Sequence, residues 1–92
     1  MSLMSKPLAY WGLKARAIVE LVFGRNAAAE RSFDAMLARW PTDPYALASR
    51  TMVRVHRGAR DAAIADAQAL VAHHPARSAA DWFNLAYLLE DA

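Results

Sequence analysis

Three arginines in the middle of the chain stand at a spacing that could contact phosphate groups. Arg50, Arg54 and Arg57 lie at i, i+4 and i+7, so a helix would carry them on one face, and Arg16 and Arg60 could extend this stripe. A basic stripe can bind nucleic acid through its phosphates. The formal net charge is only +2, which disfavours nucleic acid as the partner and favours a solvated face with acids nearby.

Histidines and serines offer no arrangement for catalysis or for metal binding. His73 and His74 are adjacent and would point about 100° apart on a helix, whereas helical metal ligands are three or four residues apart. Three serines lack an identifiable base and orienting partner, namely Ser32, Ser49 and Ser78. The chain has no cysteine and no glycine-rich phosphate loop. We therefore expect no enzyme, no cofactor and no metal.

The composition indicates one small helical domain. The chain has 92 residues, of which 57% are hydrophobic, many of them alanine, the best helix former. The absence of cysteine excludes disulfides and fits the reducing cytoplasm. Charges interrupt the apolar N-terminal stretch LKARAIVELVFG, so we expect neither a membrane span nor a signal peptide.

Two phrases of the sequence repeat one another. The first is GRNAAAERSFDAMLARWP, from Gly24 to Pro41, and the second is GARDAAIADAQALVAHHP, from Gly58 to Pro75. Gly58 follows Gly24 by 34 residues, and Pro75 follows Pro41 by the same number, which we call the repeat period. Self-similarity at such a period is typical of a repeat array. Each glycine can supply the left-handed conformation that ends a helix, and each proline closes a phrase because it lacks an N–H.

Each phrase has the apolar spacing of a helix. The apolar stripe of the first phrase is Ala29, Phe33, Met36, Leu37 and Trp40, and that of the second is Ala63, Ala67, Leu70, Val71 and His74. Helical signals also fill the intervals, so the chain predicts five helices at about 7–23, 26–40, 43–57, 59–74 and 79–91. The short joints require neighbouring helices to be antiparallel.

Three helix starts carry capping signals. Asn26 could cap the helix of the first phrase, and Asp43 followed by Pro44 opens the next helix. Ser78 and Asp81 resemble a capping box at the start of the last one.

This pattern resembles the tetratricopeptide repeat (TPR) family, whose unit is a pair of antiparallel helices of about 34 residues in all. The matching residues are Gly24 and Gly58 in the turn, Ala29, Ala63 and Phe33 in the second helix, Pro41 and Pro75 at its end, and Trp82, Leu85 and Ala86 opening a third unit. The resemblance implies a single all-α domain over 1–92, stacked as a short right-handed α-solenoid. Its divergent units would be about 10–43, 44–77 and a partial 78–92.

The first helices of two units depart from the family pattern. Strict register places Arg16 and Arg50 where the family buries leucine. Two apolar stripes suggest instead that these helices are rotated by a two-residue slip. They are Trp11–Ala15–Ile18–Val22 and Tyr45–Ser49–Met52–His56.

The resemblance implies a protein–protein interaction scaffold whose first helices line a concave groove for a partner peptide or helix. The candidate partner-binding residues are Trp11, Lys14, Ile18, Tyr45, Met52, His56, Phe83, Asn84 and Tyr87. The alternative for each is a place in the core between stacked units, since periodicity alone does not separate the two. A nucleic-acid-binding or oligomeric structural module is the second candidate function.

The first and last helices each leave a choice open. The first could bind a membrane surface through apolar residues with basic neighbours, although we prefer that it packs on the next helix. Those apolar residues are Leu8, Trp11, Ile18, Leu21, Val22 and Phe23. In the last helix Trp82, Leu85 and Leu89 would lack part of their cover. We expect a fragment of a longer array, with a self-capping helix or a homo-oligomer through this helix as the alternatives.

Overall fold

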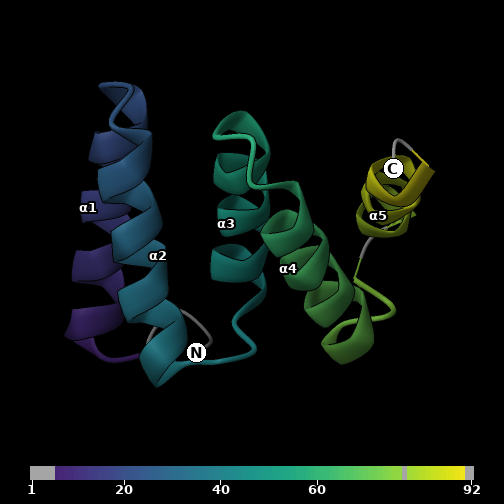
Figure 1. Cartoon of the computed structure of the whole chain (residues 1–92). Coiled ribbons are helices and arrows are strands. Elements are labelled where there is room, and N and C mark those ends of the chain that lie inside the picture. Colours follow the sequence, from purple (N-terminus) through teal and green to yellow (C-terminus); the bar gives the residue numbers. More distant parts are fainter. Residues whose placement is uncertain (1–5, 78, 91–92) are drawn as a thin grey trace.

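The computed structural model describes residues 6–77 and 79–90, and within these ranges the protein is all-α. Its helices are α1 (Leu8–Val22), α2 (Asn26–Arg39), α3 (Pro44–His56), α4 (Arg60–His73) and α5 (Ala79–Glu90) (Figure 1). The five predicted helices are confirmed, and each predicted bound differs from the observed one by at most one residue.

Each helix packs on the next one along the chain. Helices α1 to α4 run alternately up and down in Figure 1, as the short joints predict, and α5 lies at the opposite end of the molecule from α1. The molecule measures 38 × 30 × 20 Å, so it is flattened along one axis. Consecutive packing leaves the two outermost helices, α1 and α5, each with fewer neighbours than the helices between them.

The turns after α1 and α3 repeat in backbone geometry. Gly24 has a φ of 71° and Gly58 a φ of 77°, both in the left-handed region that glycine adopts without strain. The amide of Arg25 donates to the carbonyl five residues earlier at 2.8 Å, and the amide of Ala59 does the same at 2.8 Å. This six-to-one bond is the mark of a Schellman motif. The predicted role of both glycines is therefore confirmed.

The ends of α2 and α4 repeat as well. The amide of Trp40 donates to the carbonyl four residues earlier at 2.8 Å, and that of His74 at 2.9 Å. Pro41 and Pro75 follow these closing bonds, where the missing N–H removes the donor that another turn would use. The repeat period of the sequence is thus a period of the backbone too.

One predicted cap is confirmed and one is wrong. The carboxylate of Asp43 accepts a hydrogen bond from the amide of Ala46 at 2.9 Å, as the Asp-Pro signal predicts. Asn26 does not cap α2, because it is the first helical residue and the capping position belongs to Arg25. The Schellman turn already orders the chain at that point. Ser78, the other predicted cap, lies outside the described residues.

The predicted apolar stripes of α2 and α4 are confirmed. Ala29, Phe33 and Met36 have no exposed surface, and Phe33 and Met36 are among the largest fully buried side chains. The equivalent stripe of α4 is buried as well, with Ala63, Ala67, Leu70 and Val71. These stripes hold the hairpins together.

The predicted rotation of α1 and α3 is wrong. In α1, Tyr10 and Ala17 are buried, whereas Ile18 and Val22 are exposed. In α3 the buried face includes Ala46, Leu47, Thr51 and Val53, and it leaves Met52 and His56 exposed. Strict register is also wrong for Arg16, whose side chain is 72% exposed, whereas that of Arg50 is 18% exposed and neighbouring carboxylates satisfy its charge.

Candidate functional site

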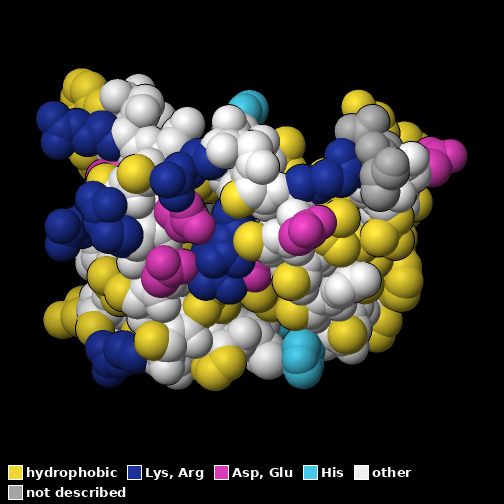
Figure 2. All heavy atoms as spheres, in the orientation of Figure 1, with side chains coloured by type: hydrophobic (Ala, Val, Ile, Leu, Met, Phe, Trp, Pro, Cys, Tyr) yellow, Lys and Arg dark blue, Asp and Glu magenta, His cyan; other side chains and the backbone are white. Residues whose placement is uncertain are grey.

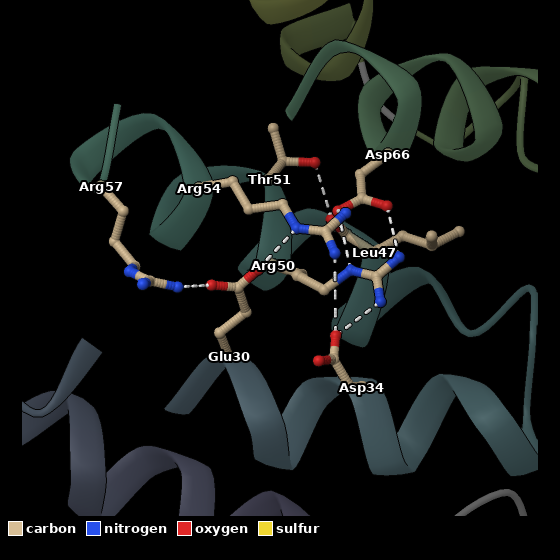
Figure 3. A network of polar contacts seen from close by, with 8 residues as sticks. All are labelled: Glu30, Asp34, Leu47, Arg50, Thr51, Arg54, Arg57 and Asp66. Carbon is tan, nitrogen blue, oxygen red and sulfur yellow. Dashed lines mark hydrogen bonds and ion pairs between the residues drawn. The ribbon is translucent and has the colours of Figure 1, made fainter. Parts of the chain in front are cut away.

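The arginine stripe lies on one face of α3, and this face meets carboxylates of α2 and α4 (Figure 3). The guanidinium of Arg50 donates two hydrogen bonds to Asp66, from Nε to Oδ2 at 2.8 Å and from Nη2 to Oδ1 at 2.6 Å. Its Nη1 donates to Oδ1 of Asp34 at 2.8 Å. Arg50 therefore links α2, α3 and α4 through charge-assisted hydrogen bonds.

Arg54 and Arg57 extend this network to Glu30 of α2. Arg54 donates from Nε to Oε2 of Glu30 at 2.8 Å and from Nη1 to Oδ2 of Asp66 at 2.9 Å. Arg57 donates to the other oxygen of Glu30. The expected solvated face is wrong, since the side chains of Arg50 and Arg54 are only 18% exposed. We call these six residues, Glu30, Asp34, Arg50, Arg54, Arg57 and Asp66, the arginine network.

Arg16 and Arg60, the two arginines that the sequence suggested as extensions of the stripe, do not extend it. Arg16 lies on α1 and pairs with Glu20 of the same helix at 3.3 Å. Arg60 donates to the carbonyl of Leu88 on α5. A phosphate group approaching the stripe would have to displace the carboxylates of the arginine network.

Electrostatics within the arginine network favour the charged forms. The hydrogen bonds with Asp66 raise the pKa of Arg50 above its usual range. The hydrogen bond from Arg54 is the main cause that lowers the pKa of Glu30 below 4.5, its ordinary value. A carboxyl whose pKa is lower in the folded state stabilises the fold when the pH is above its ordinary pKa, and this stabilisation is lost as the pH falls. The arginine network therefore stabilises the fold at neutral pH.

A lysine and two aromatic rings fill the space between α1 and α3. The Nζ atom of Lys14 lies 5.1 Å from the ring centroid of Trp11 and 4.2 Å from that of Tyr45. Both rings are half-buried and pack against the core, where Phe33 lies 6.0 Å from Tyr45. Cation–π attraction holds the ammonium group over these faces. Trp11, Lys14 and Tyr45 thus fill their predicted groove rather than leave it open.

A buried carboxylate also ties α1 to the start of α3. The hydroxyl of Tyr10 donates to both oxygens of Asp43, at 3.0 and 3.1 Å. Lys6 lies 3.6 Å from the same carboxylate. Burial, followed by the hydrogen bond to Asp43, raises the pKa of Tyr10 to about 12. Tyr10 and Lys6 both contact the carboxylate of Asp43, so this junction holds the N-terminal part of the chain against the start of α3.

An apolar trough lies between α3 and α5. Its central hollow has a volume of about 190 Å³ and is lined by Thr51, Met52, Val55, Asn84, Tyr87 and Leu88. Neighbouring hollows share residues with it: one adds Ala48, Ala67, Leu70 and the charged Asp81, and the other adds Gly58 and the charged Arg60. The three hollows adjoin one another, and we call them together the α3–α5 trough. Met52 and Tyr87 are 50% and 63% exposed.

The nine predicted partner-binding residues divide into three groups. Trp11, Lys14 and Tyr45 fill the α1–α3 space, and Met52, Asn84 and Tyr87 line the α3–α5 trough. The third group, Ile18, His56 and Phe83, is exposed outside the lining of that trough.

Sequence reasoning missed two apolar residues of the trough, Val55 and Leu88. Their signal was present, because Val55 follows Met52 by three residues and Leu88 follows Asn84 by four, which places each pair on one helical face.

The chain finds no match among models of protein families, among curated proteins or among solved structures. The described ranges contain no helix with the length and apolar character needed to cross a membrane. In the same ranges no three His, Asp or Glu side chains gather as a metal site would require. The class that fold and geometry define is therefore an all-α protein of stacked helices with an apolar trough, and the TPR resemblance stays a prediction.

Proposed function

We propose that this chain is a non-catalytic binding module, built as a divergent TPR-like α-solenoid, that receives an apolar helical segment of a partner protein in the α3–α5 trough. The observation that carries the proposal is the exposure of Met52 and Tyr87 over a hollow with an almost wholly apolar lining. Clustered apolar side chains at the surface of a small protein mark interaction sites.

The shape of the trough favours a helix as the bound segment. Its lining residues lie at helical spacing on both walls, with Ala48, Met52 and Val55 on α3 and Asn84 and Leu88 on α5. An amphipathic helix can place anchors at i, i+3 or i+4, and i+7 into such a groove. Met52 adapts its flexible thioether side chain to the anchor it meets.

The trough consists of three adjoining hollows rather than one deep pocket. The hollows measure about 80, 190 and 400 Å³. Separate shallow hollows suit successive apolar side chains of a protein segment, and Asn84 at the wall can hydrogen-bond to the segment's polar edge.

Binding to selected helical peptides tests the proposal. We would select binders from a displayed library of amphipathic helical peptides and measure their affinity for the wild type, Met52→Glu and Tyr87→Glu. We expect each substitution to weaken binding at least about tenfold, because a carboxylate would have to be desolvated in the trough. Val19→Glu, an equally exposed change on α1, is the matched control and should bind as the wild type does.

The same variants separate the candidate functions. Selected peptides that bind all variants equally would contradict the trough as the site. Nucleic-acid binding with a steep loss of affinity at higher salt would support the alternative module instead, because salt competes with phosphate contacts. In the structure, carboxylates of the arginine network already pair with the arginines on which that alternative depends.

A further inference from the structure

The outward side of α1 carries an exposed apolar stripe. Leu8, Gly12, Ala15, Val19 and Val22 follow one another at spacings of four, three, four and three, so they lie on one side of the helix. All five are exposed, including 88% of Leu8 and 74% of Val22. The buried residues of α1, Tyr10 and Ala17, lie on the opposite side. We call these five residues the α1 stripe.

The repeat shows what kind of surface the α1 stripe is. One repeat period later, Gly12 and Val19 correspond to Ala46 and Val53 of α3. Ala46 and Val53 are buried in the core cluster that α3 shares with α2. Of the other counterparts, Ser49 is half-buried, whereas Thr42 and His56 are exposed. The centre of the α1 stripe is therefore the exposed counterpart of a face that is buried elsewhere in this fold.

Gly12 makes the centre of the α1 stripe shallow. A Cβ atom added there would meet nothing within 4 Å, so packing inside this chain does not require a glycine. Glycine in the middle of a helix is unfavourable relative to alanine. A shallow centre between larger apolar residues suits a bulky side chain from outside, whereas a membrane-inserting face would gain from large side chains along its whole length.

Helix α5 has an exposed apolar stripe of its own, with a bulky side chain at each end. Leu85 and Leu88 pack on α4, and another side of α5 exposes Trp82, Ala86 and Leu89. The sequence prediction that Trp82 and Leu89 lack part of their cover is thus confirmed, since they are 48% and 47% exposed, although the indole of Trp82 donates to the carbonyl of Pro75. The prediction is wrong for Leu85, which is buried in the cluster that α5 shares with α4. We call Trp82, Ala86 and Leu89 the α5 stripe.

Charge separates the two ends of the molecule. Residues 6–41 contain six Lys or Arg and three Asp or Glu, whereas residues 75–90 contain one Arg and two acids. Basic side chains gather at the α1 edge of Figure 2, and an acidic one stands at the α5 edge. Arg16, 72% exposed, flanks the α1 stripe, and Glu90 is exposed beside the α5 stripe. Arg16 also pairs with Glu20 of its own helix, so the charge difference belongs to the two ends as a whole, with basic side chains in excess at one and acidic ones at the other.

We propose that copies of this chain associate head to tail, with the α5 stripe of one copy docked on the α1 stripe of the next. This inference goes beyond the proposed function, because neither stripe belongs to the α3–α5 trough. A contact between two different surfaces does not close on itself, so it produces chains of varying length. One pair of helices buries less than the roughly 1,200 Å² of a standard interface, so the association is weak and depends on concentration.

Sedimentation velocity over a range of protein concentrations tests the contact. The wild type should form species that grow with concentration, and higher salt should weaken them. Val19→Glu and Leu89→Glu should each be monomeric alone, since each blocks one of the two stripes. An equimolar mixture of the two variants should form a 1:1 dimer and nothing larger, because each variant retains the stripe that the other lacks.

Control variants keep this result independent of folding and of the trough. Helical circular dichroism checks that every variant folds, and Val22→Glu repeats the test at a second, highly exposed position of the α1 stripe. Met52→Glu, which alters only the trough, should associate like the wild type. Loss of peptide binding with normal association, or the reverse, would therefore separate the two proposals.

Four outcomes would overturn the proposal. The first is a wild type that remains monomeric at millimolar concentration. The second is a single variant that still dimerises, which would indicate a symmetric α1–α1 or α5–α5 contact. The third is a mixture of the two variants that stays monomeric. The fourth is vesicle binding lost in Val19→Glu without any self-association, which would assign the α1 stripe to a lipid surface.

Discussion

Side chains occupy the space between α1 and α3, whereas the space between α3 and α5 is open. Lys14 lies over the rings of Trp11 and Tyr45 in the first space. The second is the α3–α5 trough, with Met52 and Tyr87 exposed at its walls. The direction of the helices differs as well: α1 to α4 lie side-on in Figure 1, whereas α5 is seen nearly end-on. Side chains and the direction of α5 together therefore distinguish the two spaces.

One substitution along the repeat contributes to this difference. One repeat period on, Lys14 corresponds to Ala48. Ala48 lines the trough, and its small side chain leaves room that a lysine would occupy.

The two spaces also rest on cores of different size. The larger cluster, which includes Phe33 and Met36, joins α1, α2 and α3 and reaches Leu70 of α4. The smaller one joins only α4 and α5, through Ala67, Val71, Leu85, Leu88 and the half-buried Ile64. The wall of the trough that α5 supplies is therefore held by fewer buried side chains than the filled space.

The largest predicted effect contrasts these cores. Phe33→Ala should lower the free energy of unfolding by about 4 kcal/mol, since it empties a fully buried site. Leu85→Ala should cost about 2 kcal/mol and act mainly on α5. Urea denaturation gives the magnitudes, and hydrogen exchange shows where protection is lost. Uniform loss of protection over all helices in Leu85→Ala would contradict the difference between the two cores.

A second prediction concerns the arginine network, which anchors α3, the wall that both spaces share. Asp66→Ala should cost about 3 kcal/mol, because Arg50 and Arg54 lose their shared carboxylate in a largely buried place. Asp61→Ala on the exposed side of α4 should change stability by less than about 0.5 kcal/mol. Equal effects of the two changes in urea denaturation would contradict the role of the network.

Alkaline pH tests the junction beneath the filled space. The pKa of Tyr10 is raised to about 12, so its protonated form stabilises the fold below pH 10, and this contribution is lost as the pH rises toward 12. At pH 11 the loss should be about 1.4 kcal/mol. Tyr10→Phe should remove this part of the pH dependence between about pH 9 and 11, and an unchanged slope in the variant would count against the buried hydroxyl.

The smallest predicted effect converts the open space into a filled one. Ala48→Lys introduces into the trough, close to Tyr45, the side chain that stands one repeat period earlier in the α1–α3 space. Stability should rise by up to about 0.5–1 kcal/mol through cation–π contact. Binding of the selected helical peptides should fall, because the trough is occupied. The reverse change, Lys14→Ala, is the control and should leave peptide binding unaltered.

The fold was largely predictable because its signals are local. The two glycines, the two prolines and Asp43 end or start helices through backbone geometry and a single capping bond, which depend on adjacent residues. The orientation of α1 and α3 was not predictable in this way. The apolar stripes through Ile18 and Met52 had the right spacing for a core and were nevertheless exposed.

Arg50 shows why the site was harder to predict than the fold. An arginine on a buried face is costly unless its charge is paired, and its partners Asp34 and Asp66 lie 16 residues away on either side. No local pattern indicates that these three side chains meet. The same holds for Lys14, whose position over Tyr45 depends on how α1 and α3 approach each other.

The order of residues alone sets the five helices, their ends and the repeat period, since each is a property of contacts within a few residues along the chain. Tertiary packing decides which arginines are neutralised, which space is filled and which becomes the α3–α5 trough. Those outcomes depend on charge pairing and excluded volume between side chains from different helices, and such contacts exist only once the helices have packed.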